Sequence, residues 1–554
     1  MAWQRRNGPV LLLGAALLGA AVMLAVAQWG VTFFQDTWAF LLDRQDLSAD
    51  AIFAPHNEHI VVIPVLITKV LLAVFGMSSN TPEQVAMALT LFAAAILLFV
   101  YFRRRVDPWI AALAATLLLF LGSAWPVLIW PFENEFTIPI VFGLAMLLML
   151  DREDDRGDAW ACAALLVAIL SGSLGLSFIV AAAVHVFLSR KERGWRRAYV
   201  FLVPLLVYLA WYAGWGHEAE KHLTLDNILA SPAYVMEGFA SALDSLAGLS
   251  TIPVNSPGQN DWGRPLLIAA IALVAFGQSR RPGFSRGFWV VSAAAVSYWL
   301  LAGFNFIPGR EASASRYVYA GAVFVLLMAA ELLRGVRWSP RALVVAAILI
   351  ACAIGPNLAQ LKEGSEWEKE QSVFTRSDLA ALEIARGHVY PSFTLGAIDV
   401  AGTASLGIVE AGKYFEAVDR WGSPAYTPAE LEAAPQVGRH FADIVLSQAL
   451  PLTTRMETGT SPQAGAGQGC LTQAAGTGTA TSETKLGPGA VRIEVSAGPE
   501  AHVSLRRFSE GEYPVQTTPA AGGSTMLLRI PRDRAPQPWY LHVEASQAVR
   551  VCPA

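Results

Sequence analysis

Charged side chains are scarce in this chain of 554 residues. Asp, Glu, Lys and Arg make up 15% of it, whereas 54% is hydrophobic and the mean hydropathy is +0.44. Average soluble domains carry roughly 25% charged residues. The composition therefore excludes an ordinary soluble enzyme and indicates a membrane protein. The formal net charge of −4 provides no basic surface, so we expect no nucleic-acid partner.

Several familiar catalytic motifs are missing. The sequence contains no P-loop, no GxGxxG opening a helix after a strand, no HExxH and no GxSxG, which removes the usual signatures of nucleotide-phosphate sites, zinc proteases and serine hydrolases. Cysteine is rare as well, with four residues. Cys162 and Cys352 fall in apolar runs and are expected to be packed thiols. Cys470 and Cys552 bracket a β-rich segment, and we predict a disulfide between them in an oxidising compartment.

Long apolar runs are abundant before about residue 355. Runs near twenty residues with few charges predict membrane-spanning helices, because backbone groups in lipid must be hydrogen-bonded within their own segment. The first run follows Arg5 and Arg6 and lacks a clear A-x-A cleavage site, which favours an uncleaved helix over a signal peptide. We predict eleven spans, at residues 10–29, 83–102, 108–126, 136–150, 159–172, 174–189, 198–215, 264–278, 287–304, 317–334 and 341–355.

Clusters of Arg and Lys between these runs predict the orientation, because cytoplasmic loops carry an excess of both residues. All clusters share one side if residues 60–76 do not cross the bilayer. Pro64 and Lys69 inside that segment favour an interfacial or re-entrant helix, with a true span and inverted topology as the alternative. We expect a multi-pass plasma-membrane protein with a cytoplasmic N-terminus and an extracytoplasmic C-terminus. The clusters lie at residues 5–6, 103–105, 190–197, 279–286 and 334–341.

The tail after the membrane part has a different composition. Residues 356–460 show helical periodicity, and residues 461–488 are rich in small residues and read as a linker or loops. Residues 489–554 alternate apolar and polar side chains between turn residues, which predicts a small β-sandwich. The predicted fold class is a polytopic α-helical membrane domain over residues 1–355, followed by an extracytoplasmic α+β tail that ends in a sandwich.

The first predicted external loop contains an acid close to the membrane. Asp36 lies a few residues after the first span, where a partly desolvated carboxylate can act as a general base or hold a cation. A solvated helix end is the alternative interpretation of this residue.

The same loop contains the cluster HNEH, formed by His56, Asn57, Glu58 and His59. These donor types suit zinc or manganese, with Asp36, His56 and His59 as candidate ligands for a divalent metal. The spacing is not HExxH, and no further ligand is marked. Hydrogen bonding to a substrate and a plain interfacial loop are the other interpretations.

Two later external loops combine aromatic and charged side chains. Trp130, Glu133 and Glu135 precede a span, and aromatic rings with carboxylates suit a sugar, although an interfacial aromatic belt is the alternative. Arg310 and Arg316 are cations on the side where cations are scarce. Arg316 begins a span beside Tyr317, and a guanidinium there suits a phosphate. A snorkelling anchor or an ion pair with Glu311 is the alternative.

The order of these features resembles the GT-C superfamily of polyprenyl-phosphate-sugar-dependent membrane glycosyltransferases, such as the protein O-mannosyltransferases and their bacterial relatives. The matching features are one span, an acid just after it, a patch with His and Pro, an interfacial helix ending in FG, and a span closing on RRR. They cover about residues 1–200, and more weakly the spans to residue 355. The chain is also similar to polytopic actinobacterial membrane proteins.

The resemblance implies roles for four residues. Asp36 would be the base or a metal-holding acid, Glu58 or His59 a second group of the first loop, and Arg316 the contact of the lipid phosphate. The family's acids are commonly paired, whereas Asp36 is followed by Thr37.

The predicted function is transfer of a sugar, with inversion, from a polyprenyl-phosphate donor to an envelope glycan or protein on the outer side of a bacterial membrane. The alternative is a non-catalytic scaffold or flippase-like partner in envelope polysaccharide assembly. A transporter fits less well, because the charges gather in loops and no repeat is evident. Asp36 and Glu58 are the candidate catalytic residues, and the candidate substrate-binding residues are His56, Asn57, His59, Trp130, Glu133, Glu135, Arg310, Arg316 and Tyr317.

Overall fold

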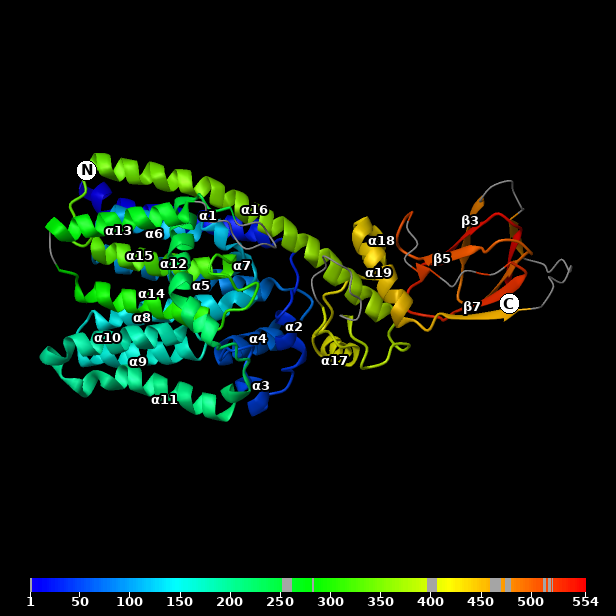
Figure 1. The fold of residues 1–554 in the computed structure, drawn as a ribbon, viewed down its shortest axis with the longest axis horizontal. Helices are drawn as coiled ribbons and strands as arrows, with labels where there is room; N and C mark the ends of the chain where they lie inside the picture. Colours follow the sequence, from blue (N-terminus) through cyan, green and yellow to red (C-terminus); the bar gives the residue numbers. More distant parts are fainter. Residues whose placement is uncertain are drawn as a thin grey trace. The chain divides into compact units, whose positions relative to one another are not determined.

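The structure is a computed structural model that describes residues 2–251, 262–280, 283–395, 406–458, 470–473, 480–511, 515–516, 520 and 522–554 (Figure 1). The chain divides into two compact units. The first consists of Met1–Val31, Arg44–Val74 and Asn80–Lys369. The second consists of Thr32–Asp43, Phe75–Ser79 and Glu370–Ala554.

Each of the eleven predicted spans coincides with a helix of the structure. Eight helices among the described residues are long and apolar enough to cross a membrane, and the protein is a multi-pass membrane protein. The number of crossings and their direction remain predictions. The eleven helices that coincide with the predicted spans are α1 (Ala2–Gln28), α5 (Thr81–Arg103), α6 (Pro108–Leu119), α8 (Asn134–Leu150), α9 (Asp155–Ile169), α10 (Gly175–Arg193), α11 (Tyr199–Gly214), α13 (Gly263–Arg280), α14 (Arg286–Phe304), α15 (Ser315–Leu332) and α16 (Pro340–Ile384).

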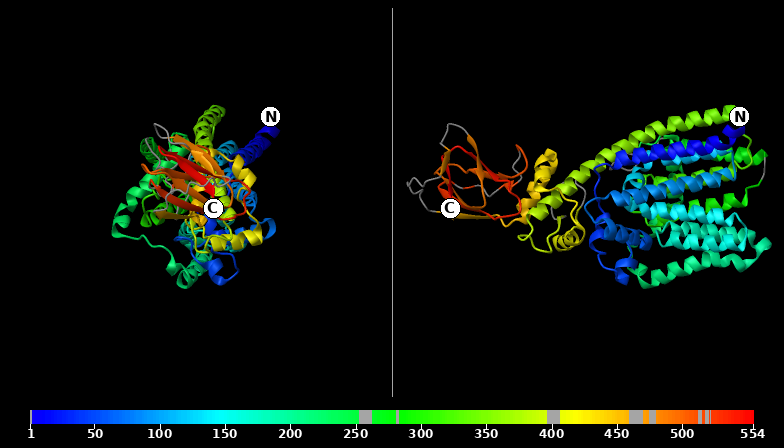
Figure 2. Two further views of the ribbon diagram at one scale, coloured as in Figure 1. Left: turned by 90° about the vertical axis from the view of Figure 1, so that its right-hand side faces the viewer. Right: turned by 180° about the vertical axis from the view of Figure 1, so that it is seen from behind.

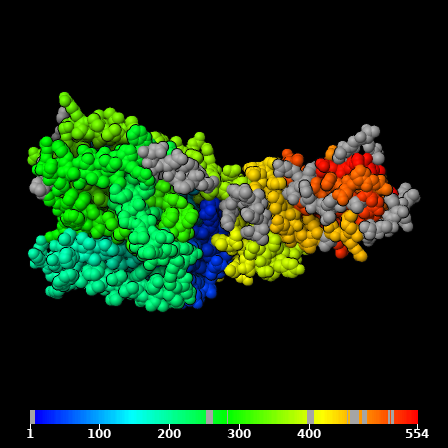
Figure 3. Space-filling view, viewed as in Figure 1, coloured from blue at the N-terminus to red at the C-terminus, as the bar shows by residue number. Residues whose placement is uncertain are grey.

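Shorter helices fill the connections. The segment predicted not to cross is α4 (Val62–Phe75), whose 14 residues extend only about 21 Å, less than the hydrocarbon core. The others are α2 (Thr37–Leu42), α3 (Ala49–Phe53), α7 (Trp125–Ile129) and the 3₁₀ turns η1 (Gly122–Ala124), η2 (Pro131–Glu133), η3 (Trp195–Ala198) and η4 (Gly216–Glu218). On one face of the first unit, the surface of α9–α11 adjoins that of α12 (Leu225–Ala247), α13 and α14 (Figure 3).

Helix α12 (Leu225–Ala247) enters the first unit without being one of the predicted spans, and it packs against α13, α14 and α15. Near its start, Asn227 donates to the carbonyl of Phe304, at the end of α14 (3.3 Å). Near its end, the carbonyl of Ser245 accepts from Asn357 (3.0 Å). Asn357 also accepts from the backbone N–H of Ser123 (2.9 Å), and Ser123 is bonded to the start of α15. Both ends of α12 therefore lie at the end of the bundle where α14 ends and α15 begins.

The predicted basic clusters gather at the opposite end of the helices. Arg105 binds Asp151, just after α8, with contacts of 3.0 and 2.8 Å, and also binds Glu331 in the last turn of α15. Arg286, at the start of α14, binds Glu192 near the end of α10 (2.7 Å). These contacts place several clusters at one end of the bundle, as the sequence predicts. At the edge of the bundle, α1 and α16 run side by side (Figures 1 and 2), and Ser365 donates to the carbonyl of Ala27 (2.7 Å).

The second unit contains helices and two antiparallel sheets, ordered β1-β7-β4-β9-β2 and β3-β8-β5-β6. The sandwich was predicted to begin at residue 489, and this start is too late. Three strands before that residue, β1, β2 and β3, pair with β7, β9 and β8. Residues 461–469 and 474–479 of the predicted linker lie outside the described residues. The elements are α17 (Ala411–Trp421), α18 (Pro428–Ala433), α19 (Gln436–Ala449), β1 (Thr453–Thr458), β2 (Leu471–Gln473), β3 (Ala480–Leu486), β4 (Gly489–Val495), β5 (His502–Arg506), β6 (Val515–Gln516), β7 (Ser524–Ile530), β8 (Trp539–Ala545) and β9 (Val549–Pro553).

Alternation along the strands builds the core between the sheets. Ile493 on β4 lies opposite Met526 and Val551 on its two neighbours, and all three are buried. The predicted disulfide is confirmed: Cys470, just before β2, is bonded to Cys552 on β9. A covalent link across 82 residues restricts the unfolded chain and so stabilises this unit.

Candidate functional site

The HNEH cluster forms a tight turn of the first unit. The backbone N–H of His59 donates to the carbonyl of His56 (2.8 Å), and the N–H of His56 donates to the carbonyl of His59 (3.0 Å). Asn57 adopts a φ of 51°, a left-handed conformation that Asn tolerates better than most residues. The turn is fixed from outside by Ser173, whose hydroxyl donates to the carbonyl of Glu58 (3.3 Å).

Replacing Asn57 with valine should lower the free energy of unfolding by about 1 to 2 kcal/mol, because a β-branched residue is strained in the left-handed region. Thermal unfolding of the purified protein, followed by tryptophan fluorescence, measures the change. Glycine at the same position is the matched control and should cost little, since it adopts this conformation freely. Equal losses for both variants would show that the Asn57 side chain, and not its backbone, holds the turn.

Glu58 is held by a cation from a distant part of the sequence. Its Oε1 atom accepts from Nη1 of Arg310, and the side chains are 16% and 14% exposed. Nε2 of His59 lies 3.6 Å from the same carboxylate oxygen. Within the part of the chain that the structure describes, Oε2 of Glu58 is buried and accepts no hydrogen bond. One oxygen of this carboxylate is therefore paired and the other is left for a further donor.

Both ionisable groups of the turn have shifted pKa values. Burial opposes ionisation of Glu58, but His59 and the hydrogen bond and charge of Arg310 bring its pKa below the ordinary 4.5. Burial, together with the positive charge of Arg310, lowers the pKa of His59 to about 4, against the opposing effect of Glu58. At neutral pH Glu58 is therefore a carboxylate and His59 a neutral imidazole.

The loop between α14 and α15 presents Arg310 to this turn. The hydroxyl of Tyr234 donates to the Arg310 carbonyl (2.7 Å), and the Arg310 N–H donates to the carbonyl of Ile307 (2.9 Å). Arg316, predicted to contact a phosphate, donates from Nη2 to the carbonyl of Gly309 (3.0 Å). Its guanidinium also lies over the Tyr317 ring, 5.4 Å from the ring centre. Arg316 thus helps to hold the loop that carries Arg310.

Glu58 and His59 line a cavity of about 370 Å³, within the usual size range of small-molecule sites. Tyrosine rings and apolar side chains form much of its wall, and carboxylate, amine, hydroxyl and amide groups are interspersed. Such a mixture suits a ligand with apolar faces and several hydroxyl groups. The lining residues are Glu58, His59, Phe136, Ser173, Leu174, Leu176, Ser177, Tyr208, Tyr212, Ala219, Glu220, Lys221, Leu223, Tyr298, Leu301, Ala302, Phe304, Asn305 and Tyr317.

Most of this wall is not marked by any pattern in the sequence. No sequence motif identifies Tyr208 and Tyr298, which lie in apolar helices, or Lys221, which lies in a connection. The residues around them show no distinctive spacing. Ser173 and Ser177 belong to the small-residue stretch SGSLGLS. A stretch of small residues between two short helices indicates that another segment can approach closely there. This pattern could have identified these two serines.

The remaining predicted residues lie around the turn or beyond it. The ring of His56 meets the edge of Phe132 (5.0 Å between ring centres), and Trp130 stacks on Phe132 (5.2 Å). Trp130 is buried, with 7% exposure, and is therefore not an exposed platform for a sugar. Glu133 is buried and Glu135 is partly buried, and neither belongs to the lining of this cavity.

Asp36 belongs to the second unit, whereas the HNEH turn belongs to the first. It precedes the short helix α2, whose Trp38 is fully buried and contacts the ring edge of Tyr414 (6.1 Å). Among the described residues, no three or more His, Cys, Asp or Glu side chains are arranged to hold a metal ion. The metal interpretation of Asp36, His56 and His59 therefore gains no support.

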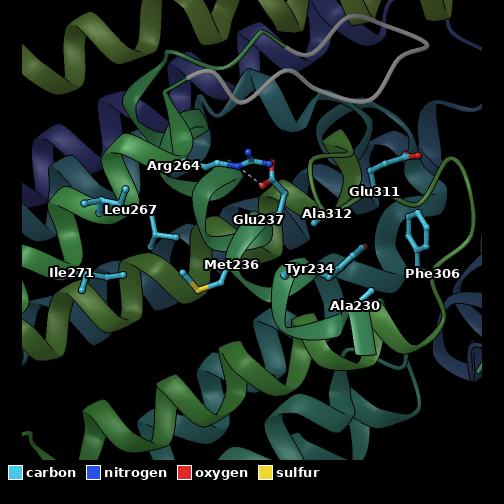
Figure 4. A pocket seen from close by; sticks show the side chains of 13 residues that line it. Ala230, Tyr234, Met236, Glu237, Arg264, Leu267, Ile271, Phe306, Glu311 and Ala312 are labelled. Carbon is cyan, nitrogen blue, oxygen red and sulfur yellow. Dashed lines mark hydrogen bonds and ion pairs between the residues drawn. The ribbon is translucent and has the colours of Figure 1, made fainter. Parts of the chain in front are cut away.

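A second and larger cavity, of about 730 Å³, lies between α12 and α13. Its wall is mainly aliphatic, and Glu237 and Arg264 form an ion pair of 3.1 Å at one side (Figure 4). Glu311 and Phe306 lie at the other side of the same view. Glu311 thus lines the larger cavity, while the adjacent Arg310 binds the carboxylate of the smaller one.

Neither a protein-family model nor a curated protein matches the sequence. Solved structures with a similar arrangement include ArnT from Cupriavidus metallidurans in the apo state, at 13% identity and a TM-score of 0.47, over 82% of this chain and 93% of that one. The oligosaccharyltransferase of Archaeoglobus fulgidus, tethered with an acceptor peptide, has 13% identity and a TM-score of 0.41, over 83% and 70% of the two chains.

A third similar structure is AglB from Archaeoglobus fulgidus, in complex with an inhibitory peptide and a dolichol-phosphate, at 13% identity and a TM-score of 0.41, over 82% and 70% of the chains. At this identity the comparisons assign no role to any residue of this chain.

Proposed function

We propose that this protein is a membrane glycosyltransferase. It transfers a sugar from a polyprenyl-phosphate donor to a hydroxyl group of an envelope glycan or protein on the outer side of the plasma membrane. The observation that carries the proposal is the Glu58 carboxylate, which lines a cavity of about 370 Å³ with one oxygen bound by Arg310. An ionised carboxylate at the wall of a cavity of this size is the group that an acceptor hydroxyl requires as a base.

In the proposed reaction, Glu58 takes the proton of the acceptor hydroxyl while the hydroxyl oxygen attacks the anomeric carbon of the sugar. The bond between that carbon and the phosphate oxygen breaks, and its electron pair leaves with the polyprenyl phosphate. Attack opposite the leaving group inverts the anomeric centre. Arg310 lies beside Glu58, where its positive charge stabilises the negative charge that develops on the leaving phosphate. Asp36, which precedes the same HNEH turn in the sequence, is the second candidate for the base.

Tyrosine side chains support binding of a sugar at this wall. Tyr208, Tyr212, Tyr298 and Tyr317 all line the cavity. Their rings cover the apolar faces of a pyranose, and their hydroxyls remain able to exchange hydrogen bonds with it. Such contacts orient the anomeric carbon toward the carboxylate, and positioning of this kind supplies a large part of the rate in group transfer.

Replacing Glu58 with glutamine should lower the rate of polyprenyl-phosphate release about 100-fold or more, since a general base contributes 10²- to 10⁴-fold. The assay uses membranes that contain the full-length protein, a polyprenyl-phosphate-linked sugar and total envelope acceptors. Asp36→Asn is tested in parallel, because either carboxylate can be the base. Glu218→Gln is the matched control: Glu218 lies on η4, is 68% exposed and should leave the rate within about twofold. Unchanged release in both the Glu58 and Asp36 variants would reject the catalytic assignment.

The Glu58–Arg310 ion pair also favours the alternative function, a non-catalytic partner in envelope polysaccharide assembly. On this alternative, the paired carboxylate has a structural role and holds two loops together. The Glu58→Gln and Arg310→Gln variants would then lose thermal stability to similar extents, and the wild-type membranes would release no polyprenyl phosphate. Release by the wild type that depends on Glu58 excludes this function.

A further inference from the structure

We propose that Arg310 is a phosphate-binding residue and that Glu58 occupies its position in the present structure, so that the carboxylate and a phosphate exchange at one guanidinium. The inference rests on the proposed function and adds an order to its steps. The phosphate of the donor binds first and displaces Glu58, and the displaced carboxylate then becomes available to the acceptor.

The contacts of Arg310 leave room for this exchange. In the described part of the chain, the Arg310 guanidinium has one ionic partner, Glu58, and uses one nitrogen, Nη1, to bind it. A guanidinium has five N–H donors in a planar fork that matches two oxygens of a phosphate. A phosphate can therefore replace a single-oxygen contact with a two-oxygen contact on the same side chain.

The backbone around Arg310 is fastened independently of Glu58. Tyr234 holds the carbonyl of Arg310, Ile307 holds its N–H, and Arg316 holds the carbonyl of Gly309. Loss of the Glu58 contact therefore leaves the position of the arginine intact. This arrangement also explains why we assign the phosphate to Arg310 and not to Arg316, whose Nη2 atom is engaged by Gly309 within the loop.

Glu58 is poorly satisfied where it lies. Its Oε2 atom is buried and accepts no hydrogen bond from any described residue, and an unsatisfied buried acceptor is costly. Burial raises the pKa of Glu58 and His59 lowers it, and both effects remain once Arg310 turns to a phosphate, whereas the lowering by the Arg310 hydrogen bond is lost, so the pKa rises. The displaced carboxylate is then a stronger base than the paired one, which suits a group that must act after the donor has bound.

The experiment measures phosphate binding to the purified full-length protein in detergent, without sugar transfer. Two probes are titrated and followed by tryptophan fluorescence: inorganic phosphate and a short-chain polyprenyl phosphate. Glu58→Gln removes the competing negative charge and should tighten binding of the polyprenyl phosphate about tenfold, whereas Arg310→Gln should weaken it about tenfold or more. Because the Glu58 variant is expected to gain affinity, misfolding cannot produce the expected result.

Glu311→Gln is the matched control. It removes the same charge from the residue next to Arg310, but Glu311 lines the larger cavity between α12 and α13. Its carboxylate accepts from the backbone N–H of Gly309 (3.0 Å), which a glutamine amide oxygen can also do, so the affinity should change less than about twofold. Unchanged or weaker binding in Glu58→Gln would overturn the exchange, and so would a loss of binding in Arg316→Gln with none in Arg310→Gln. If Glu58→Gln tightened the binding of inorganic phosphate but not of polyprenyl phosphate, the site at Arg310 would be assigned to free phosphate and the proposed order of steps would be overturned.

These outcomes are separable from the test of the proposed function. If Glu58→Gln binds polyprenyl phosphate more tightly while wild-type membranes release none from a sugar donor, the exchange stands and the transferase proposal fails. If release occurs and depends on Glu58 while the affinity stays unchanged, the transferase proposal stands and the exchange fails.

Discussion

Replacing Arg105 with methionine should lower the free energy of unfolding of the first unit by about 3 to 5 kcal/mol, the usual effect of removing one partner from a buried ion pair. Arg105 is 3% exposed and its partner Glu331 is fully buried. Glu331 also accepts from Tyr101 (2.8 Å) and Ser285 (2.7 Å). Without the guanidinium, a negative charge would remain at a position from which water is excluded.

Thermal unfolding in detergent, followed by tryptophan fluorescence, measures this change. Arg103→Met is the matched control, since Arg103 lies two residues away, is exposed and should alter stability by less than about 0.5 kcal/mol. The double variant Arg105→Met, Glu331→Leu should recover most of the loss, because two apolar side chains replace the fully buried pair, while Asp151 is partly exposed and keeps Arg104 as a partner (3.5 Å). A double variant as unstable as the single one would show that volume, and not charge, makes this position important.

Replacing Asp443 with alanine should destabilise the second unit by about 4 kcal/mol, because several buried donors lose the acceptor that they share and each costs roughly 1 to 3 kcal/mol. Asp443, on α19, is fully buried. Its carboxylate accepts the backbone N–H groups of Arg507 (2.8 Å), Phe508 (2.9 Å) and Ser509 (3.0 Å), and the hydroxyl of Ser509 (2.7 Å). This one side chain therefore fastens a helix to the segment that follows β5.

Hydrogen exchange of the full-length protein locates the effect. The amides of Arg507, Phe508 and Ser509 should exchange much faster in the Asp443 variant, while those of the helices in the first unit stay protected. Glu416→Ala serves as control, because Glu416 is exposed on α17 and its removal should cost less than about 0.5 kcal/mol. Unchanged protection at residues 507–509 would contradict the role given to this carboxylate.

The helices were predictable because lipid leaves a chain few options. Apolar runs such as that of α5 must satisfy their backbone internally, so length and composition are sufficient to place them. Residues 232–249 predict an amphipathic helix, which overlaps α12, but hydropathy does not mark it as a span because Asp226, Glu237 and Asp244 interrupt its apolar residues. The start of the sandwich was placed too late because β1 and β3 are rich in Thr and charged residues, which resemble a linker in composition.

The site was only partly predictable. The HNEH stretch and the arginines of the loop between α14 and α15 could each be recognised as unusual for their surroundings. The contact between Glu58 and Arg310 could not be predicted, because the two residues are 252 positions apart. Local sequence patterns do not specify which loops meet. Arg316 was preferred as the phosphate contact because it begins a helix, whereas the structure shows its guanidinium bonded to the backbone at Gly309.

The buried ions around Arg105 have a mechanical consequence for the cavity. They join α5, α8, α14 and α15 at one end, so this end acts as a fulcrum. Glu58 and Arg310 lie beyond the other end of α14 and α15, and the 18 residues of α15 form a lever about 27 Å long. A tilt of only about 5° at the fulcrum would shift the far end by about 2 Å. Small rotations would thus move the loop that carries Arg310 while leaving the packing around the fulcrum almost undisturbed.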